Sequence, residues 1–411
     1  MSATPPTVLV PGPDDFDDIA QLIADAFGHP IDPETHEVER GVFEPDRALL
    51  VRDGGAAVAH VAAYGRTLSV PGATVPAAHV TLVSVAATHR RRGLLTTLMG
   101  RQLREIHDAG REPVAVLWAS EGRIYPRFGY GLAAQRLTID CPATTELRLP
   151  APTSAPGTLR LDRPAARQAE LARLYDRLRP ERPGWSTRDE RWWRYVLSDP
   201  PSQRSGATAR RVLLHEGPDG VDGYALFRTA QDWDAFGPKG LVRVDEVVAA
   251  DPDGYLALWR ALFSVDLTRR LSYHRAAVDE PLLRLVNEPR RLGAHLVDAL
   301  WVRLVDVPAA LAARRYATAV DLVIEVTDPL LPENTGRWRL TGGPTGATCV
   351  RTDDPAELAC DVRCLGELYL GGSTPTALAA AGRIRERRPG ALAAAGPAFG
   401  WHRAPAPMEI F

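Results

Sequence analysis

The fold of this chain is decided by the stretch Val83-Ser84-Val85-Ala86-Ala87-Thr88-His89-Arg90-Arg91-Arg92-Gly93-Leu94-Leu95. The β-branched residues of His79–Ala86 predict a strand, and the apolar residues from Arg92 to Asp108 recur at helical spacing. The first turn of a helix presents unpaired backbone N–H groups, and arginines add positive charge beside it. The stretch therefore predicts an α/β unit whose strand-to-helix turn binds an anion such as pyrophosphate, the alternative being a solvated basic helix cap.

The flanking sequence continues the alternation of helix and strand as far as Ile139. Asp-Gly-Gly at positions 53–55 predicts a hairpin turn, because glycine tolerates the positive φ that such turns require. Asp residues at the start of the first helical segment are expected to cap it. The pattern predicts helices over Asp14–Phe27 and Arg92–Asp108, a short helix after Trp118, and strands over Ala48–Arg52, Ala56–Val70, His79–Ala86, Pro113–Trp118 and Leu132–Ile139.

The remainder of the chain divides into two further blocks. Pro142–Gly157 is rich in proline and predicts a linker. Val242–Phe263 repeats the order of strand, Val-Ala-Ala, loop and helix, but its loop, residues 251–254, is acidic and cannot bind an anion. A third block, from about Gly293, contains the predicted strand Asp321–Thr327 and a predicted helix near Thr376–Arg388. The expected domains are residues 1–150, 151–290 and 291–411.

Composition excludes several classes of protein. The chain has 411 residues, of which 45% are hydrophobic and 24% are charged, so it is neither largely disordered nor collagen-like. The net charge of −2 provides no basic field for nucleic acid. The four cysteines lack zinc-site spacing, so no metal is expected. We expect a cytoplasmic protein without a membrane partner, because neither a signal peptide nor an apolar run of about 18–20 residues is visible.

Several motifs together resemble one family. Arg90-x-x-Gly93-x-Leu95 is similar to the Arg/Gln-x-x-Gly-x-Gly/Ala motif of the GNAT superfamily of N-acetyltransferases, with Leu95 in place of the usual small residue. The narrower resemblance is to the Eis (enhanced intracellular survival) acetyltransferases. Four segments carry it: residues 88–95 (THRRRGLL), 119–131 (ASEGRIYPRFGYG), 298–311 (DALWVRLVDVPAAL) and 366–372 (GELYLGG).

The resemblance implies an α/β (α+β) architecture of tandem GNAT acetyltransferase-like domains followed by a sterol-carrier-like domain. The second acetyltransferase-like domain would be degenerate, which agrees with its acidic loop. The resemblance also implies acetyl-CoA as the donor, small amines including aminoglycosides as acceptors, and a homohexamer.

The site residues follow from the chemistry of acyl transfer and from the matching motifs. Tyr125 is the candidate general acid, because a phenol stays protonated at neutral pH; the alternative is a packing aromatic. The resemblance implies that the terminal carboxylate, which here belongs to Phe411, acts as the base; the alternative is simple apolar anchoring of the terminus. Val85 N–H is the expected oxyanion donor. The expected acetyl-CoA contacts are Val83, Ser84, Val85, Arg90, Arg91, Arg92, Gly93, Leu94, Leu95, Thr96, Ser120 and Glu121, and the expected acceptor contacts are Phe27, His29 and Glu409.

Two other functions stay open from the sequence. One is acetylation of lysine side chains on proteins, and the other is non-catalytic binding of an acyl-CoA or a lipid by the third domain. The basic turn and Tyr125 favour the enzyme over the second of these.

Overall fold

A computed structural model describes residues 7–148 and 157–411, so that part of the predicted linker, residues 149–156, lies outside the described residues. The chain forms two compact units. The first comprises Met1–Ala134, Ala299–His402 and Ile410–Phe411, and the second comprises Gln135–Asp298 and Arg403–Glu409. Each unit is therefore assembled from segments that are distant in sequence.

The first unit contains a seven-stranded sheet that confirms the predicted early strands. Its order is β1-β2-β3-β4-β5-β16-β6. The predicted hairpin turn is present, with φ of 57° at Gly54 and 88° at Gly55, the positive values that this tight turn requires. The strands are β1 Thr7–Leu9, β2 Ala48–Asp53, β3 Ala56–Val70, β4 Ala73–Val85, β5 Val114–Trp118, β6 Gly131–Leu132 and β16 Leu300–Leu304.

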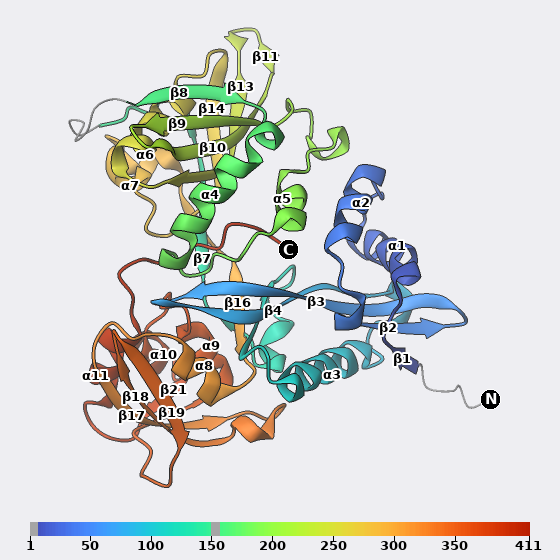
Figure 1. Cartoon of the computed structure of the whole chain (residues 1–411), viewed down its shortest axis with the longest axis vertical. Helices are drawn as coiled ribbons and strands as arrows, with labels where there is room; N and C mark the ends of the chain where they lie inside the picture. The colour runs from blue at the N-terminus through green and yellow to red at the C-terminus, as the bar shows by residue number, and fades with distance from the viewer. Residues whose placement is uncertain (1–6, 149–156) are drawn as a thin grey trace. The chain divides into compact units, whose positions relative to one another are not determined.

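Helices cover both faces of this sheet. Figure 1 shows α1 (Phe16–Phe27) on one face of the β3–β4 region and α3 (Leu94–Ala109) on the other. Side chains along a strand alternate between faces; accordingly Leu50 packs with α1, whereas Leu49 packs with α3. The expected aspartate cap of α1 is wrong, because Asp15 accepts from the Gly12 N–H instead. A further helix, α2, spans Pro33–Val42.

A five-stranded sheet completes the first unit, in the order β19-β18-β17-β20-β21. The predicted strand Asp321–Thr327 is confirmed, but the predicted helix near Thr376–Arg388 is wrong beyond its first turns. Gly382, with φ of 72°, ends the helical segment, and the chain then pairs with β20. The elements are β17 Val320–Thr327, β18 Gly336–Gly343, β19 Gly346–Arg351, β20 Leu358–Asp361, β21 Ile384–Glu386, α8 Val307–Ala313, α9 Val362–Leu368, α10 Pro375–Ala380 and α11 Ala391–Phe399.

The second unit repeats the layered arrangement of the first, in which one sheet lies between helices. Its seven-stranded sheet has the order β15-β7-β14-β13-β10-β9-β8, with α4 packed on one face and α6 on the other. The predicted internal repeat is confirmed, since β13 leads into α6 as β4 leads into α3. The elements are β7 Gln135–Pro142, β8 Thr158–Asp162, β9 Arg211–Gly217, β10 Gly220–Ala230, β11 Trp233–Asp234, β12 Gly237–Pro238, β13 Gly240–Ala249, β14 Thr268–Ala276, β15 His295–Asp298, α4 Gln168–Leu178, α5 Glu190–Leu197, α6 Pro252–Phe263 and α7 Leu282–Leu285.

The single strand predicted over Leu132–Ile139 is wrong, because two strands of different sheets occupy it. β6 ends at Leu132, and the backbone N–H groups of Ala133 and Ala134 then both donate to the Leu300 carbonyl. β7 begins at Gln135 and pairs with β14 of the other sheet. In the first sheet β16, which follows in sequence only after residues 135–298 of the second unit, pairs with β5. No helix of the described residues is long and apolar enough to cross a membrane.

Candidate functional site

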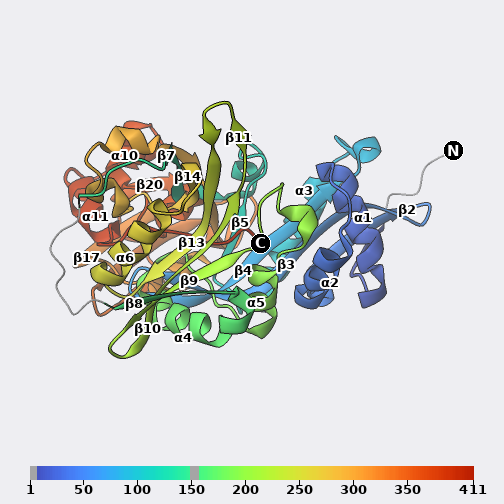
Figure 2. The same ribbon diagram turned by 90° about the horizontal axis from the view of Figure 1, so that it is seen from above.

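The site of the first unit begins where two parallel strands separate. β4 pairs with β5 only through Ala77, Ala78 and His79. β4 then continues to Val85 with β3 as its neighbour on one side (Figure 2). The other edge of β4 beyond His79 is therefore free of β5, and its backbone groups are available to a ligand.

The direction of the Val85 amide follows from the strand pairing. The N–H of Ala86 donates to the Val58 carbonyl at 2.8 Å, so Ala86 and Val58 form a hydrogen-bonded pair. Adjacent pairs in an antiparallel ladder alternate between hydrogen-bonded and non-hydrogen-bonded, which makes Val85 and Ala59 a non-hydrogen-bonded pair. The Val85 N–H therefore faces the free edge. Val83, two residues earlier, lies at a register shift and has no partner residue on β3.

A β-bulge shapes β4 just beyond the point of separation. The register with β3 shifts between His60 and Ala62, and Leu82 has a φ of 52°, which is uncommon for a residue with a side chain. The ring Nδ1 of His60 lies 2.9 Å from the Leu82 carbonyl oxygen. Burial lowers the pKa of His60 to about 4, so the ring is neutral at pH 7 and donates this hydrogen bond. Sequence reasoning missed His60, because no motif marks a histidine that supports a bulge.

The basic turn leads into a helix without a side-chain cap. Arg91 and Gly93 have φ of 62° and 84°, and Gly93 occupies the N-cap of α3, where it has no side chain to accept from the first N–H groups. The side chains of Arg90, Arg91 and Arg92 are exposed, and none pairs with a carboxylate of the described residues. Leu94, Leu95 and Thr96 supply the first N–H groups of this helix, which makes the turn chemically suited to a pyrophosphate.

Two further details fit a ligand that crosses from the turn to the free edge. The Nε of Arg90 lies 3.4 Å from the Val85 carbonyl oxygen, so the guanidinium reaches from the turn to the end of β4. The Ser84 hydroxyl is buried without a hydrogen-bond partner among the described residues. Leaving a buried hydroxyl without a hydrogen bond is unfavourable, and a bound ligand could supply that hydrogen bond.

Tyr125 opens a 3-10 helix, Tyr125–Phe128, and its side chain is 7% exposed within the apolar cluster that also contains Leu94 and Leu117. Burial, and secondly the charge of Glu121, raises the pKa of Tyr125 to about 12. The phenol is therefore protonated at every ordinary assay pH. Ser120 and Glu121 lie on the exposed segment just before it, where Glu121 accepts from Arg123 at 2.9 Å.

The chain terminus lies against β4. The Thr81 hydroxyl donates to the terminal oxygen of Phe411 at 2.9 Å, and the Phe411 ring packs edge-on against the His79 ring at a centroid separation of 4.7 Å. Both contacts are made at the start of the free edge. Neither Thr81 nor His79 was marked by the sequence, since Phe411 lies at the far end of the chain.

The expected acceptor contacts lie in different surroundings. Phe27 and His29 are exposed at the end of α1, with ring centroids 6.4 Å apart. Glu409 belongs to the second unit, where it is buried and accepts from the Nε of Arg188 at 2.5 Å. Arg188 also donates to both carboxylate oxygens of Glu246. Glu409 is thus part of a buried charge cluster.

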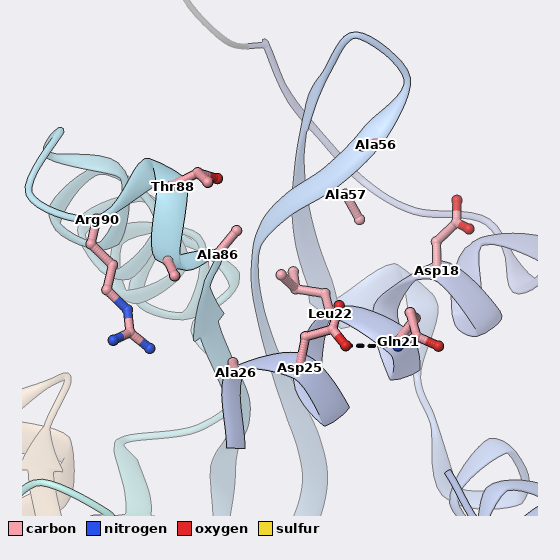
Figure 3. Close-up of a pocket in the computed structure, with 11 residues that line it drawn as sticks. Asp18, Gln21, Leu22, Asp25, Ala26, Ala56, Ala57, Ala86, Thr88 and Arg90 are labelled. Atoms are coloured by element: carbon pink, nitrogen blue, oxygen red, sulfur yellow. Dashed lines mark hydrogen bonds between the residues drawn. The ribbon is translucent and has the colours of Figure 1, made fainter. Parts of the chain in front are cut away.

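A cavity of about 420 Å³ lies beside the basic turn, and sequence reasoning missed it. Figure 3 shows α1 contributing Asp18, Gln21 and Asp25 to its lining, with Arg90 across from them. Asp18 pairs with Arg52 at 2.7 Å, whereas Asp25 accepts only from the neutral amide of Gln21 at 2.8 Å among the described residues. Asp25 is therefore an available carboxylate. No cluster of metal-ligating side chains occurs in residues 7–148 and 157–411.

Comparison with known proteins agrees with this geometry. Residues 11–133 and 184–304 each match an acetyltransferase (GNAT) domain family, and residues 307–407 match a sterol carrier protein domain family. An uncharacterized N-acetyltransferase of Streptomyces avermitilis is 48% identical over 89% of this chain and 90% of its own length.

Two relatives carry the Eis name. The N-acetyltransferase Eis of Mycobacterium tuberculosis is 38% identical, with 93% of each chain covered. The crystal structure of Eis1 from Mycobacterium abscessus superposes with a TM-score of 0.83 at 32% identity, covering 98% of this chain and all of the other. The two GNAT domains, the sterol-carrier-like domain and these relatives show that the chain is an acetyltransferase of the Eis family within the GNAT superfamily.

Proposed function

We propose that this enzyme transfers the acetyl group of acetyl-CoA to primary amines of small polyamine acceptors such as aminoglycosides. The observation that carries the proposal is the meeting, on one strand, of a free backbone edge and the terminal carboxylate, with an uncapped basic helix N-terminus directly after the strand. GNAT acetyltransferases use acetyl-CoA. The free edge of β4 suits its pantetheine arm, and the basic helix N-terminus suits its pyrophosphate.

The donor is bound along β4 and the turn. Val83 and Val85 offer backbone groups to the pantetheine amides, and Ser84 offers its unpaired hydroxyl. The arginines at 90–92 and the first N–H groups of α3 receive the pyrophosphate. Ser120 and Glu121 line the far side of the donor.

The base is the Phe411 carboxylate, held by Thr81. Val83 is nearer than Val85 to Thr81 along β4. The Val83 N–H is therefore better placed to donate to the oxyanion than the Val85 N–H, which was the donor expected from the sequence. The carboxylate takes the proton of the acceptor ammonium directly or through one water, and the free amine attacks the acetyl carbonyl.

Tyr125 completes the reaction as general acid. As the tetrahedral intermediate collapses, its nitrogen loses one proton to solvent water, the new amide forms, the thioester C–S bond breaks, and the Tyr125 hydroxyl gives its proton to the departing thiolate. The phenolate then recovers a proton from solvent. A pKa of about 12 means that the hydroxyl always carries the proton it must donate.

The acceptor binds in the cavity beside the turn. Asp25 supplies a carboxylate for one ammonium of a polycationic acceptor, and Phe27, which follows the lining residue Ala26, offers a ring against a sugar. Protein lysines are a weaker candidate, because no feature of the described residues favours them. The family resemblance supports a homohexamer, and the proposal keeps the cytoplasmic location expected from the sequence.

The first prediction concerns the turn. Gly93→Asp places an acidic cap at the N-terminus of α3, and Arg91→Ala removes one cation. One lost charge-assisted contact is worth roughly 1.5–3 kcal/mol, so each variant should raise the CoA dissociation constant about 10–150-fold by calorimetry. Arg111→Ala is the matched control, since Arg111 lies beyond the opposite end of α3. Unchanged affinity in both test variants would reduce the turn to a solvated helix cap.

The second prediction concerns Tyr125→Phe, which keeps the ring and removes the proton. We expect kcat to fall about 10²–10⁴-fold while CoA affinity is retained. Tyr130→Phe is the control, because the Tyr130 hydroxyl is buried without a partner in the described chain and its loss should leave kcat unchanged. Wild-type enzyme should show no loss of activity from Tyr125 deprotonation up to about pH 11, because its pKa is about 12. Normal turnover by Tyr125→Phe contradicts the role.

The third prediction concerns the terminal carboxylate. Converting it to an amide by peptide ligation, or adding one glycine after Phe411, should lower kcat by about 10²–10⁴-fold with CoA binding retained, because the proton acceptor is lost or displaced. Ile410→Ala is the control: its side chain is 52% exposed, and the carboxylate stays in place. Full activity of the amidated enzyme would rule out Phe411 as the base.

The fourth prediction tests the acceptor. A panel of amines, assayed by release of free CoA thiol, should show preference for polycationic amines over monoamines of equal size. Asp25→Asn should raise KM for the polycations about fivefold, with kcat little changed, because one exposed charge contact is worth up to about 1 kcal/mol. The exposed Asp14→Asn is the control. Acetylation of a mixed-protein pool, but of no small amine, would instead favour a protein substrate.

A further inference from the structure

The second unit contains a cleft built in the same way as that of the first. β13 pairs in parallel with β14 only from Gly240 to Val244, and then continues alone on that edge to Ala249. The N–H of Ala250 donates to the Asp222 carbonyl at 2.8 Å. By the alternation of an antiparallel ladder, the amides of Ala249 and Val247 therefore face the free edge. This matches the arrangement of Val85 on β4.

A cavity of about 510 Å³ lies along this free edge, and every residue that lines it belongs to the second unit. Its volume is typical of small-molecule sites. Val247 and Ala249 line it, together with the rings of Tyr255, Tyr273 and Trp185. A pocket with aromatic walls and unpaired backbone amides is suited to an extended chain that contains amide groups.

The indole N–H of Trp185 is a second, independent observation at this cavity. The side chain is 8% exposed and stacks on Tyr175 with ring planes 8° apart. Its indole N–H is buried and has no acceptor among the described residues. Indole is only a donor, so a carbonyl oxygen of a bound molecule would satisfy it.

The end of the cavity at α6 differs from its counterpart in the first unit. Asp251 lines the cavity and is the N-cap of α6, where its carboxylate accepts from the Gly254 N–H at 2.9 Å. The position that Gly93 leaves open is therefore filled here by a negative charge. A phosphate at this place would meet electrostatic repulsion and a helix N–H that is already satisfied.

The other charges around the cavity largely balance. Arg182 and Asp279 form an ion pair, and Arg275 donates to the Asp245 carbonyl. Glu280 is buried, and it accepts from the Tyr255 hydroxyl. Burial raises the pKa of Glu280, which favours its neutral form. The remaining cation, Arg403, lines the cavity without an ion pair among the described residues, so its positive charge is set against the negative charge of Asp251 in the same lining.

We propose that this second cleft binds an extended, uncharged, amide-bearing small molecule of the pantetheine type, and that it rejects the phosphorylated form. The amides of the ligand pair with Val247 and Ala249 on β13, and one of its carbonyls accepts from the Trp185 indole. The cleft is thus a second ligand site, separate from acetyl-CoA binding on β4 and independent of the proposed reaction.

The test uses the full chain saturated with CoA, so that the first cleft is occupied. The tryptophans are ¹⁵N-labelled at the indole, and Trp185→Phe assigns the Trp185 resonance. Pantetheine should shift this resonance saturably, and 4′-phosphopantetheine, which differs only by its phosphate, should bind about tenfold more weakly or less. No shift with pantetheine up to its solubility limit, or equal shifts with both probes, would overturn the proposal.

Two variants test the free-edge amide and the acidic helix cap separately. Ala249→Pro removes one free-edge N–H without removing a bond to β10, and should weaken pantetheine binding about tenfold, the equivalent of one lost hydrogen bond. Asp251→Asn preserves the cap hydrogen bond but removes the charge. It should therefore reduce the difference in affinity between pantetheine and 4′-phosphopantetheine. If Ala249→Pro fails to fold, Asp251→Asn decides alone: an unchanged preference against phosphate would contradict the proposed role of the acidic cap.

Discussion

The structure depends on two parallel strands that pair for only part of their length. After His79, β4 no longer has β5 beside it, and its backbone N–H and C=O groups on that edge lack a partner strand. Buried backbone groups must find partners, so such an edge is stable only where solvent or a ligand can reach it. The bulge at Leu82 and its hydrogen bond to the neutral His60 set the course of β4 through this region.

Both units contain such a free strand edge, but the helix that follows it begins differently in each. In both, a strand leaves its parallel neighbour and leads into a helix that packs on the sheet. In the first unit the helix begins after Gly93, which leaves its N–H groups free beside three arginines. In the second, Asp251 satisfies the helix terminus with its own carboxylate. The N-cap residue therefore distinguishes two clefts of the same backbone design, because an open helix terminus favours a bound anion and a carboxylate there disfavours one.

The C-terminal segment is held by two kinds of interaction close to its end. Glu409 joins the buried cluster of Arg188 and Glu246 in the second unit, whereas Phe411 is held in the first unit by Thr81 and by the ring of His79. Removing one member of a buried charge cluster is strongly destabilising, because it leaves the remaining charge without compensation. In the reaction proposed above, the contacts with Thr81 and His79 make the Phe411 carboxylate a better-positioned base than a mobile one.

Local sequence determined a large part of this protein. Most of the early strands and helices, the Gly54-Gly55 turn and the strand–turn–helix repeat at positions 80–103 and 242–263 are set by short-range preferences, and the structure confirms them. The family motifs also lie within short segments, so the acetyltransferase class was readable from them.

Only the tertiary structure decided what depends on contacts between distant residues. It assigned β6 and β7 to different sheets, because a period of two indicates which face a side chain takes but not which strand it joins. It brought Phe411 to Thr81 from the far end of the chain, joined Glu409 to Arg188, and set Asp25 beside the turn. Such partners are selected by packing and charge in three dimensions, and no local preference of the chain encodes them.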